Sequence, residues 1–355
     1  MKKTLIALAL TALPVAAMAD VVLYGQIKGG VGTTFGDGDT NGTITQMEDY
    51  GSRIGFKGEE ELGNGLKAIW QVEQRVSLAG AGASEGWNTR DTFVGLEGGF
   101  GKVRAGYVSD QFNENMETMD FWEYRTGAGA NVRGLATMTR FDGRSQGVRY
   151  DSPDFGGFNF NVTHQLGDSA TETKFEPSLS VDGHGSTMGQ STIVGLNYEN
   201  AGFFGKVGYG LYKHTSIKNG NVQDGQVARV EAGYDANNLF VALAYQYAKD
   251  MQGYGALENT TVEKAHEAAV SVGYTMGALT PKLSYAHGWD QETAGSKVKN
   301  SGYDQVIIGA DYALSKRTTA LVSAGWLNTG SSVDANGNLK DEDLYSVGVG
   351  VRHKF

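Results

Sequence analysis

Apolar and polar side chains alternate with a period of two along most of the chain. In the last eleven residues, Tyr345 to Phe355, Tyr, Val, His and Phe occupy the odd positions, and Ser, Gly, Arg and Lys occupy the even ones. A period of two is typical of a β-strand with one apolar and one polar face. The same alternation predicts sixteen strands. They lie at 21–29, 53–57, 66–73, 92–96, 103–107, 144–151, 157–166, 191–199, 203–213, 226–235, 239–248, 262–275, 279–289, 304–312, 317–327 and 344–355.

The connections between these strands alternate in length. Short ones lie at 152–156, 200–202, 236–238, 277–278 and 314–316, and long polar ones at 167–190, 214–225, 249–261, 290–303 and 328–343. Such asymmetry is typical of outer-membrane barrels, which have short periplasmic turns and long outer loops. A strand of about ten residues tilted by about 45° spans roughly 23 Å, close to their apolar band of about 25 Å. The pattern predicts an all-β protein, a 16-stranded antiparallel transmembrane β-barrel, wide enough for an aqueous channel. In a soluble sandwich, the alternative, the apolar face would be the core.

The first residues predict a secretory signal peptide, residues 1–19. Lys2 and Lys3 precede an apolar run from Leu5 to Val15, and Ala17-Met18-Ala19 is a small-residue cleavage site. The barrel domain is then 20–355, exported to the outer membrane of the cell. Without Lys2 and Lys3 the formal charge falls from −10 to −12, which argues against a nucleic-acid partner. The chain has no cysteine, which excludes disulfides and thiolate chemistry.

Six stretches of the sequence are distinctive. They are D-V-V-L-Y-G-Q-I-K-G-G-V at 20–31, I-G-F-K-G-E-E-E-L-G-N-G-L-K-A-I-W-Q-V-E-Q-R-V at 54–76, V-R-Y-D-S-P at 148–153, S-Y-A-H-G at 284–288, Y-D-Q-V-I-I-G-A-D-Y-A-L-S-K-R-T at 303–318 and V-G-V-R-H-K-F at 349–355. Together they resemble the neisserial-type (betaproteobacterial) general porins of Gram-negative bacteria. The resemblance covers nearly the whole mature chain, but not the loops 36–50, 168–190 and 249–262. It implies sixteen strands, a homotrimer and a third loop folded inward to narrow the pore. It also implies that the outer-membrane assembly machinery reads the terminal aromatic, Phe355.

The third loop, 109–143, breaks the alternation and is rich in acids. With the resemblance, this acidity predicts one wall of a charged constriction: Asp110, Glu114, Glu117, Asp120 and Glu123. Strand parity predicts the opposite, basic wall: Lys28, Arg53, Lys67, Arg75, Arg90 and Arg104. Opposed charges across a narrow pore set up a transverse field, which disfavours uncharged, apolar solutes. The alternative is an ordinary solvated acidic loop. Arg125, Arg133 and Arg140 follow in the same loop and partly neutralise its charge.

One polar loop matches a calcium-binding pattern. Asp37, Asp39, Asn41 and Glu48, with Gly42, fill every specified position of the twelve-residue EF-hand loop. Predicted strands flank it instead of helices, so a plain outer loop is the alternative. No other cofactor site is expected. The six histidines lack metal-ligand spacing, and no catalytic Ser-His-Asp grouping is evident.

These features predict an outer-membrane porin that passes ions and small hydrophilic solutes, and not an enzyme. The expected partners are two further copies of the chain, outer-membrane lipids and lipopolysaccharide, and the assembly machinery. Three alternatives stay open: a channel selective for phosphate, another anion or a sugar; a lipase-type barrel; and a non-conducting barrel that acts as an adhesin. The opposite signs of the two predicted walls leave the preference between anions and cations undecided.

Overall fold

The structure is a computed structural model that describes residues 21–36, 42–79, 90–122, 130–166, 190–218, 221–333 and 339–355. In these ranges nineteen strands form one sheet. The strands are β1 (Val22–Gly36), β2 (Ile44–Asp49), β3 (Arg53–Gly63), β4 (Leu66–Arg75), β5 (Thr92–Gly98), β6 (Gly101–Ser109), β7 (Arg144–Asp151), β8 (Phe158–Gln165), β9 (Ser191–Asn200), β10 (Phe203–Lys218), β11 (Asn221–Ala236), β12 (Leu239–Gln252), β13 (Thr261–Tyr274), β14 (Leu279–Gly288), β15 (Glu292–Thr293), β16 (Ser296–Lys297), β17 (Tyr303–Ala313), β18 (Thr318–Val333) and β19 (Leu339–Lys354). The helices are α2 (Gln111–Glu114), α3 (Ala130–Arg133) and the 3-10 helix η2 (Gly255–Leu257).

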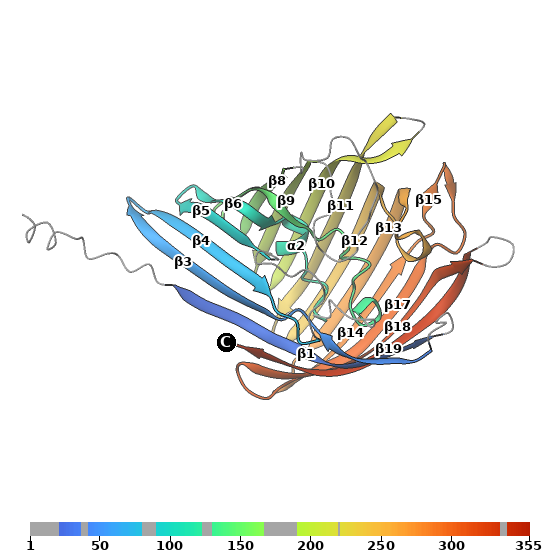
Figure 1. Cartoon of the computed structure of the whole chain (residues 1–355). Coiled ribbons are helices and arrows are strands. Elements are labelled where there is room, and N and C mark those ends of the chain that lie inside the picture. The colour runs from blue at the N-terminus through green and yellow to red at the C-terminus, as the bar shows by residue number, and fades with distance from the viewer. Residues whose placement is uncertain are drawn as a thin grey trace, which may run out of the picture.

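Sixteen of these strands form a closed antiparallel barrel, as the alternation predicts (Figure 1). Strands β2, β15 and β16 extend its edges in the loop regions. The ring closes where β1 pairs with β19, from Gln26 opposite Lys354 to Gly36 opposite Leu344. Each ring strand therefore pairs with a neighbour on both sides, which satisfies the backbone groups that a membrane cannot hydrate. Among the described residues, no helix is both long and apolar enough to cross a membrane.

Tight turns close one end of the barrel. Asn64 and Gly65 join β3 to β4 with φ of 54° and 74°, and Asn237 and Asn238 join β11 to β12 with φ of 53° and 65°. Two successive residues with positive φ are characteristic of the type I′ hairpin turn, which Asn and Gly tolerate best. The short connection predicted at 236–238 is confirmed, and the β3–β4 turn is of the same kind.

The two faces of the sheet differ in chemistry as predicted. The side chains that point away from the ring are largely aliphatic or aromatic and exposed; Val94 is 64% exposed, Leu243 56% and Ile308 54%. The opposite face is polar and buried, for example at Gln246 and Glu267. An aliphatic surface on every side of a closed ring fits a lipid environment.

The third loop (residues 110–143) contacts the polar face of the ring. It carries α2 and α3, and its fully buried residues include Phe112, Met116, Met119, Leu135 and Met138. Glycines in the wall make room for them: a Cβ on Gly208 would lie 2.6 Å from the Phe112 ring. The small residues on the polar face of the strands thus leave the space in which the side chains of the loop pack.

Candidate functional site

The third loop is tied at its neck, where β6 ends and β7 begins. The Asp110 N–H donates to Gly143 O at 3.0 Å, and the Asp110 carboxylate accepts from the Asn113 N–H at 2.9 Å, capping α2. Burial raises the pKa of the Asp110 carboxyl to about 6, although the Asn113 N–H and the Arg149 guanidinium lower it. Only 1% of Asp110 is exposed. The structure therefore places Asp110 in the neck, and not on the solvent-facing acidic wall where the sequence predicted it.

Glu114 and Arg104, predicted on opposite walls, are in contact. Arg104 Nη2 lies 2.8 Å from Glu114 Oε2 and 2.8 Å from Asp151 Oδ2. Arg149, directly opposite Arg104 in the β6–β7 register, reaches the same two carboxylates at 3.3 and 2.7 Å. Helix α2 follows β6 directly, so the loop folds Glu114 back onto the strand that precedes it. Two guanidiniums and two carboxylates thus form one neutral cluster at the base of the loop.

Four other predicted cations lie on β1, β3 and β4 and just before β5, on the side of β6 away from β7. We call Lys28 of β1, Arg53 of β3, Arg75 of β4 and Arg90 before β5 the basic wall. Arg53 and Arg75 are directly opposite in the β3–β4 register. Glu73 was not among the predicted site residues. It contacts Arg90 and lies 3.5 Å from Arg53 Nε. The Arg53 side chain keeps 36% exposure. The basic wall is thus only partly neutralised by Glu73.

Lys67 lies apart from the basic wall. It belongs to the same strand and face as Arg75, but eight positions away, about 26 Å along β4. Its ammonium pairs with Glu59 at 2.8 Å and with Glu61 at 3.1 Å beside the β3–β4 turn. Parity placed Lys67 on the correct face but not at the correct height, and the structure assigns it to the rim of the barrel.

The remaining predicted acids are in the first half of the third loop. Glu117 and Asp120 are half-buried, and the Asp120 N–H donates to Glu117 O at 3.1 Å. Asp120 Oδ1 accepts from the Trp122 N–H at 3.4 Å. Glu123 and Arg125 lie outside the described residues.

Three cations on β10, β11 and β14 hold the third loop through backbone carbonyls and two side-chain oxygens. They project from the polar face of β10, β11 and β14, positions that inward parity identifies but that the sequence analysis left out of the site. The contacts are Lys206 Nζ to Asn115 O (3.0 Å) and Thr118 Oγ1 (2.8 Å), Arg229 Nη2 to Met138 O (2.6 Å) and Nη1 to Asp142 Oδ1 (2.7 Å), and Lys282 Nζ to Phe121 O (2.8 Å). Charge-assisted hydrogen bonds of this kind are about twice as strong as neutral ones.

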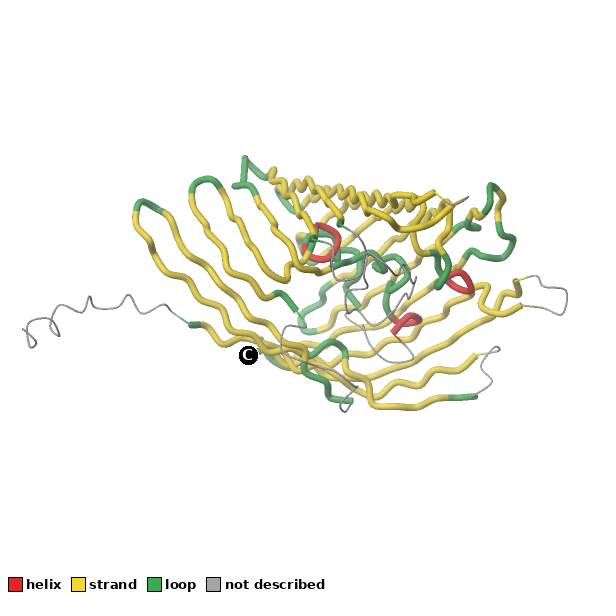
Figure 2. The backbone as a smooth tube through the Cα atoms, turned by 45° about the horizontal axis from the view of Figure 1, so that its top comes forward, coloured by secondary structure: helices red, strands yellow, loops and turns green. Residues whose placement is uncertain are grey.

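The second half of the loop is held by carboxylates and an amide on β13, β17 and β2. Arg140 pairs with Glu267 of β13, and Arg133 pairs with Glu48 of β2. Gln305 of β17 donates to the carbonyls of Asn131, Val132 and Gly134. The contacts run along the ring from β6 to β19 and reach β2, and Figure 2 shows the helices and loop segments among the strands. The basic wall lies on the other strands of the ring, β1, β3 and β4, and just before β5.

The calcium hypothesis rests on residues that are only partly described. Residues 37–41, with Asp37, Asp39 and Asn41, lie outside the described ranges, but Glu48 is 1% exposed and paired with Arg133. Within the described part of the chain, no group of three or more His, Cys, Asp or Glu side chains could hold a metal ion. Calcium binding stays a prediction, and it would require Glu48 to leave Arg133.

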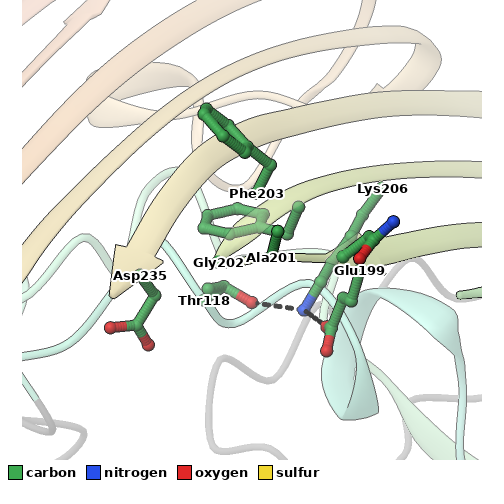
Figure 3. Close-up of a pocket in the computed structure, with 9 residues that line it drawn as sticks. Thr118, Glu199, Ala201, Gly202, Phe203, Lys206 and Asp235 are labelled. Carbon is green, nitrogen blue, oxygen red and sulfur yellow. Dashed lines mark hydrogen bonds and ion pairs between the residues drawn. The ribbon is translucent and has the colours of Figure 1, made fainter. Parts of the chain in front are cut away.

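A cavity of about 340 Å³ opens beside the β9–β10 turn. Thr118, Glu199, Phe204, Lys206 and Asp235 are among its lining residues (Figure 3). Lys206 Nζ bonds Thr118 Oγ1 at 2.8 Å and Glu199 Oε1 at 3.2 Å within it. The cavity lies against the third loop and shares the contact that holds the loop to β10.

Phe355 completes the ring. Its backbone N–H and C=O each bond Gly25 of β1 at 3.1 Å, and its side chain is 41% exposed. These two hydrogen bonds extend the β1–β19 pairing to the last residue.

A closed barrel with an aliphatic outer surface, a polar interior and a charged loop against its inner wall defines the class: a transmembrane β-barrel channel. The chain belongs to the Gram-negative porin family, whose model matches residues 20–355. It is 45% identical to the major outer membrane protein P.IB of Neisseria sicca and 42% identical to that of Neisseria gonorrhoeae, each over 100% of both chains.

Solved structures agree with the fold. An anion-selective porin from Comamonas acidovorans superposes with a TM-score of 0.73 at 23% identity, covering 95% of this chain and 100% of that one. Salmonella typhi OmpF in complex with daunomycin gives a TM-score of 0.69 at 21% identity, with 95% and 98% covered. The protein is thus an outer-membrane porin.

Proposed function

We propose that this porin passes ions and small hydrophilic solutes passively, through a constriction between the third loop and the basic wall. The observation that carries the proposal is the distribution of the loop's contacts. They occupy the inner face from β6 to β19, whereas Arg53 in the basic wall keeps a partly exposed side chain. The narrowest water-filled section then lies beside Arg53 and Arg75.

The energetics require no cofactor and no catalysis. Transfer of a bare ion into a lipid-like medium costs tens of kcal/mol by a Born estimate, and a hydrated lumen avoids that cost. The partly exposed guanidinium of Arg53 adds positive potential to the section, and low-dielectric walls focus such fields to several kT. Ion preference follows from the balance between this wall and the acids of the loop.

Planar-bilayer recordings in a salt gradient test the proposal. The wild type should give stable ohmic steps, and Arg53→Ser should move the reversal potential toward cation preference. Arg317→Ser, which removes the same charge at an exposed turn, should move it less. Absence of conductance in the wild type would favour the adhesin alternative. Saturation by one solute would favour the selective channel. Equal shifts in both variants would place the constriction elsewhere.

We also propose that the protein is a homotrimer that contacts outer-membrane lipids, lipopolysaccharide and the assembly machinery. The support is family membership and the lipid-compatible outer surface. Detergent extraction followed by electrophoresis with and without boiling should show a heat-sensitive trimer. A monomer under both conditions would contradict this.

Calcium binding by the first outer loop is tested by isothermal titration. We expect heat from the wild type and none from an Asp37→Ala, Glu48→Ala double variant. Equal heats from the two proteins, or no heat from either, would contradict calcium binding at this loop.

A further inference from the structure

Two lysines lie directly opposite one another on the outer surface of the barrel. Lys249 of β12 and Lys264 of β13 are register partners, and their side chains are 46% and 45% exposed. Directly opposed residues have Cβ atoms about 5 Å apart, and like charges at that spacing destabilise a sheet. Their known acidic contacts are separate: Lys264 Nζ lies 2.7 Å from Glu292, and Lys249 Nζ is only within 3.9 Å of Asp250.

The pair belongs to a longer row of cations on neighbouring strands. Lys249 pairs with Gln226 of β11, which pairs with Leu211 of β10, and Lys213 stands two positions beyond Leu211. On the other side Lys264 is opposite Glu292, and Glu292 is opposite Lys297. The row therefore spans β10 to β16. Asp224 at Lys213 and Glu292 at Lys264 offset part of its charge.

An aromatic belt lies directly below the row. On the Lys249 face of β12, the side chains run Leu243, Tyr245, Tyr247 and Lys249, from apolar to aromatic to cationic. Tyr245 bonds His266 of β13 at 2.6 Å and lies near Trp289. Aromatic side chains of this kind mark the level of the lipid headgroups.

The height of Lys249 along β12 agrees with the level of the lipid headgroups. Ten positions separate Leu239, at the short-turn end of β12, from Lys249. That length is about 33 Å along the strand and about 23 Å across the membrane at a tilt of about 45°. The ammonium groups therefore lie at the upper boundary of the apolar band, on the side of the long loops.

We propose that Lys249 and Lys264, flanked by Lys213 and Lys297, bind the phosphate of a phosphorylated glycolipid in the outer leaflet. The phosphate would bridge the two opposed ammonium groups, and the acyl chains would lie against Leu243 and Val270 below. This rests on the proposed function, in which the barrel spans the outer membrane and contacts its lipids, and it assigns one lipid site to named residues on the outer surface. Headgroup phosphate supplies negative charge to both ammonium groups, beyond the partial offset that Glu292 gives at Lys264.

Native mass spectrometry of the detergent-purified protein with bisphosphorylated lipid A tests the site. Lys249→Gln/Lys264→Gln should weaken binding by at least about tenfold. Lys316→Gln/Arg317→Gln, which removes two charges at the exposed turn on the opposite rim, should stay within about twofold of the wild type. Dephosphorylated lipid A should bind the wild type as weakly as the lysine variant binds the phosphorylated lipid. Inorganic pyrophosphate at equal concentration should not displace the lipid, because it lacks acyl chains.

Three results would overturn the inference: equal weakening in both double variants, equal binding of the two lipids, or full displacement by pyrophosphate. Bilayer conductance of Lys249→Gln/Lys264→Gln should match the wild type, since both side chains face outward. A changed conductance would contradict that placement. Loss of lipid binding specificity with normal conductance would leave the porin function intact, and absent conductance in the wild type would count against the proposed function instead.

Discussion

Glu114 of the third loop and Arg104 of β6 form an ion pair at 2.8 Å, although the sequence places them on two opposed walls. Arg149 and Asp151 join this pair in a cluster of two guanidiniums and two carboxylates, so the base of the loop is locally neutral. Charge separation across the pore must therefore arise further along the loop, opposite the basic wall.

Glu114→Gln should shift selectivity toward anions. The substitution keeps the side-chain volume and leaves Arg104 and Arg149 with Asp151 as their remaining shared carboxylate. The reversal potential in a salt gradient measures the change. It should be clear near 0.1 M salt and much smaller near 1 M, where the screening length falls from about 10 Å to about 3 Å. Glu60→Gln, an exposed residue near the β3–β4 turn, is the control. A shift toward cations would contradict the lumenal placement of Glu114.

Arg229→Met should destabilise the loop and the barrel. Arg229 is fully buried and binds Asp142 and the carbonyl of Met138, so its removal takes a positively charged partner away from a buried carboxylate. Breaking one partner of a buried pair costs about 3–5 kcal/mol. Thermal unfolding in detergent should show the loss, and single-channel records should show added current noise. The double variant Arg229→Met/Asp142→Leu should recover much of the stability. An equal loss in both variants would mean that Asp142 is not the partner that matters.

Asp110→Asn should remove a pH dependence of stability. Burial raises the folded-state pKa of Asp110 to about 6, above the ordinary value of 3.8 for an aspartic acid side chain. The ionised carboxyl therefore opposes folding above pH 6, and this penalty disappears as pH falls toward 4 because the folded protein takes up the proton first. Melting temperatures from pH 7 to pH 4 should rise for the wild type relative to Asp110→Asn. Asp235→Asn, an exposed control, should follow the wild type. Parallel curves for the wild type and Asp110→Asn would show that Asp110 ionises normally.

Deletion of Phe355 should reduce assembly more than the stability of the finished barrel. The deletion removes two backbone hydrogen bonds to Gly25, each contributing about 1 kcal/mol, from a ring with many such bonds. Outer-membrane levels should fall, while protein refolded in detergent should melt near the wild-type temperature. Phe355→Tyr keeps the terminal aromatic and is the control. Wild-type levels of the deletion variant in the membrane would rule out the assembly role.

The strands were predictable because lipid and water impose opposite chemistry on alternate residues, as at Leu243 and Gln246. Parity also placed Arg53, Arg75 and Lys67 on the inner face. It could not give height, so Lys67 was grouped with residues about 26 Å away. The anchors of the loop were not predictable either: Arg229 and Met138 are 91 positions apart, and no local pattern joins them. That Glu123 lines the pore stays a prediction.

The pairing of β1 with β19 has a kinetic consequence. Gln26 and Lys354 are more than 300 positions apart, so this contact carries the largest loop-closure entropy in the ring. A topology whose decisive contact joins the two extremes of the chain has a high contact order and folds slowly. Until that contact forms, both terminal strands present unsatisfied edges on which other chains can polymerise. The same seam that closes the mature barrel thus leaves two strand edges open during its biogenesis until β1 and β19 pair.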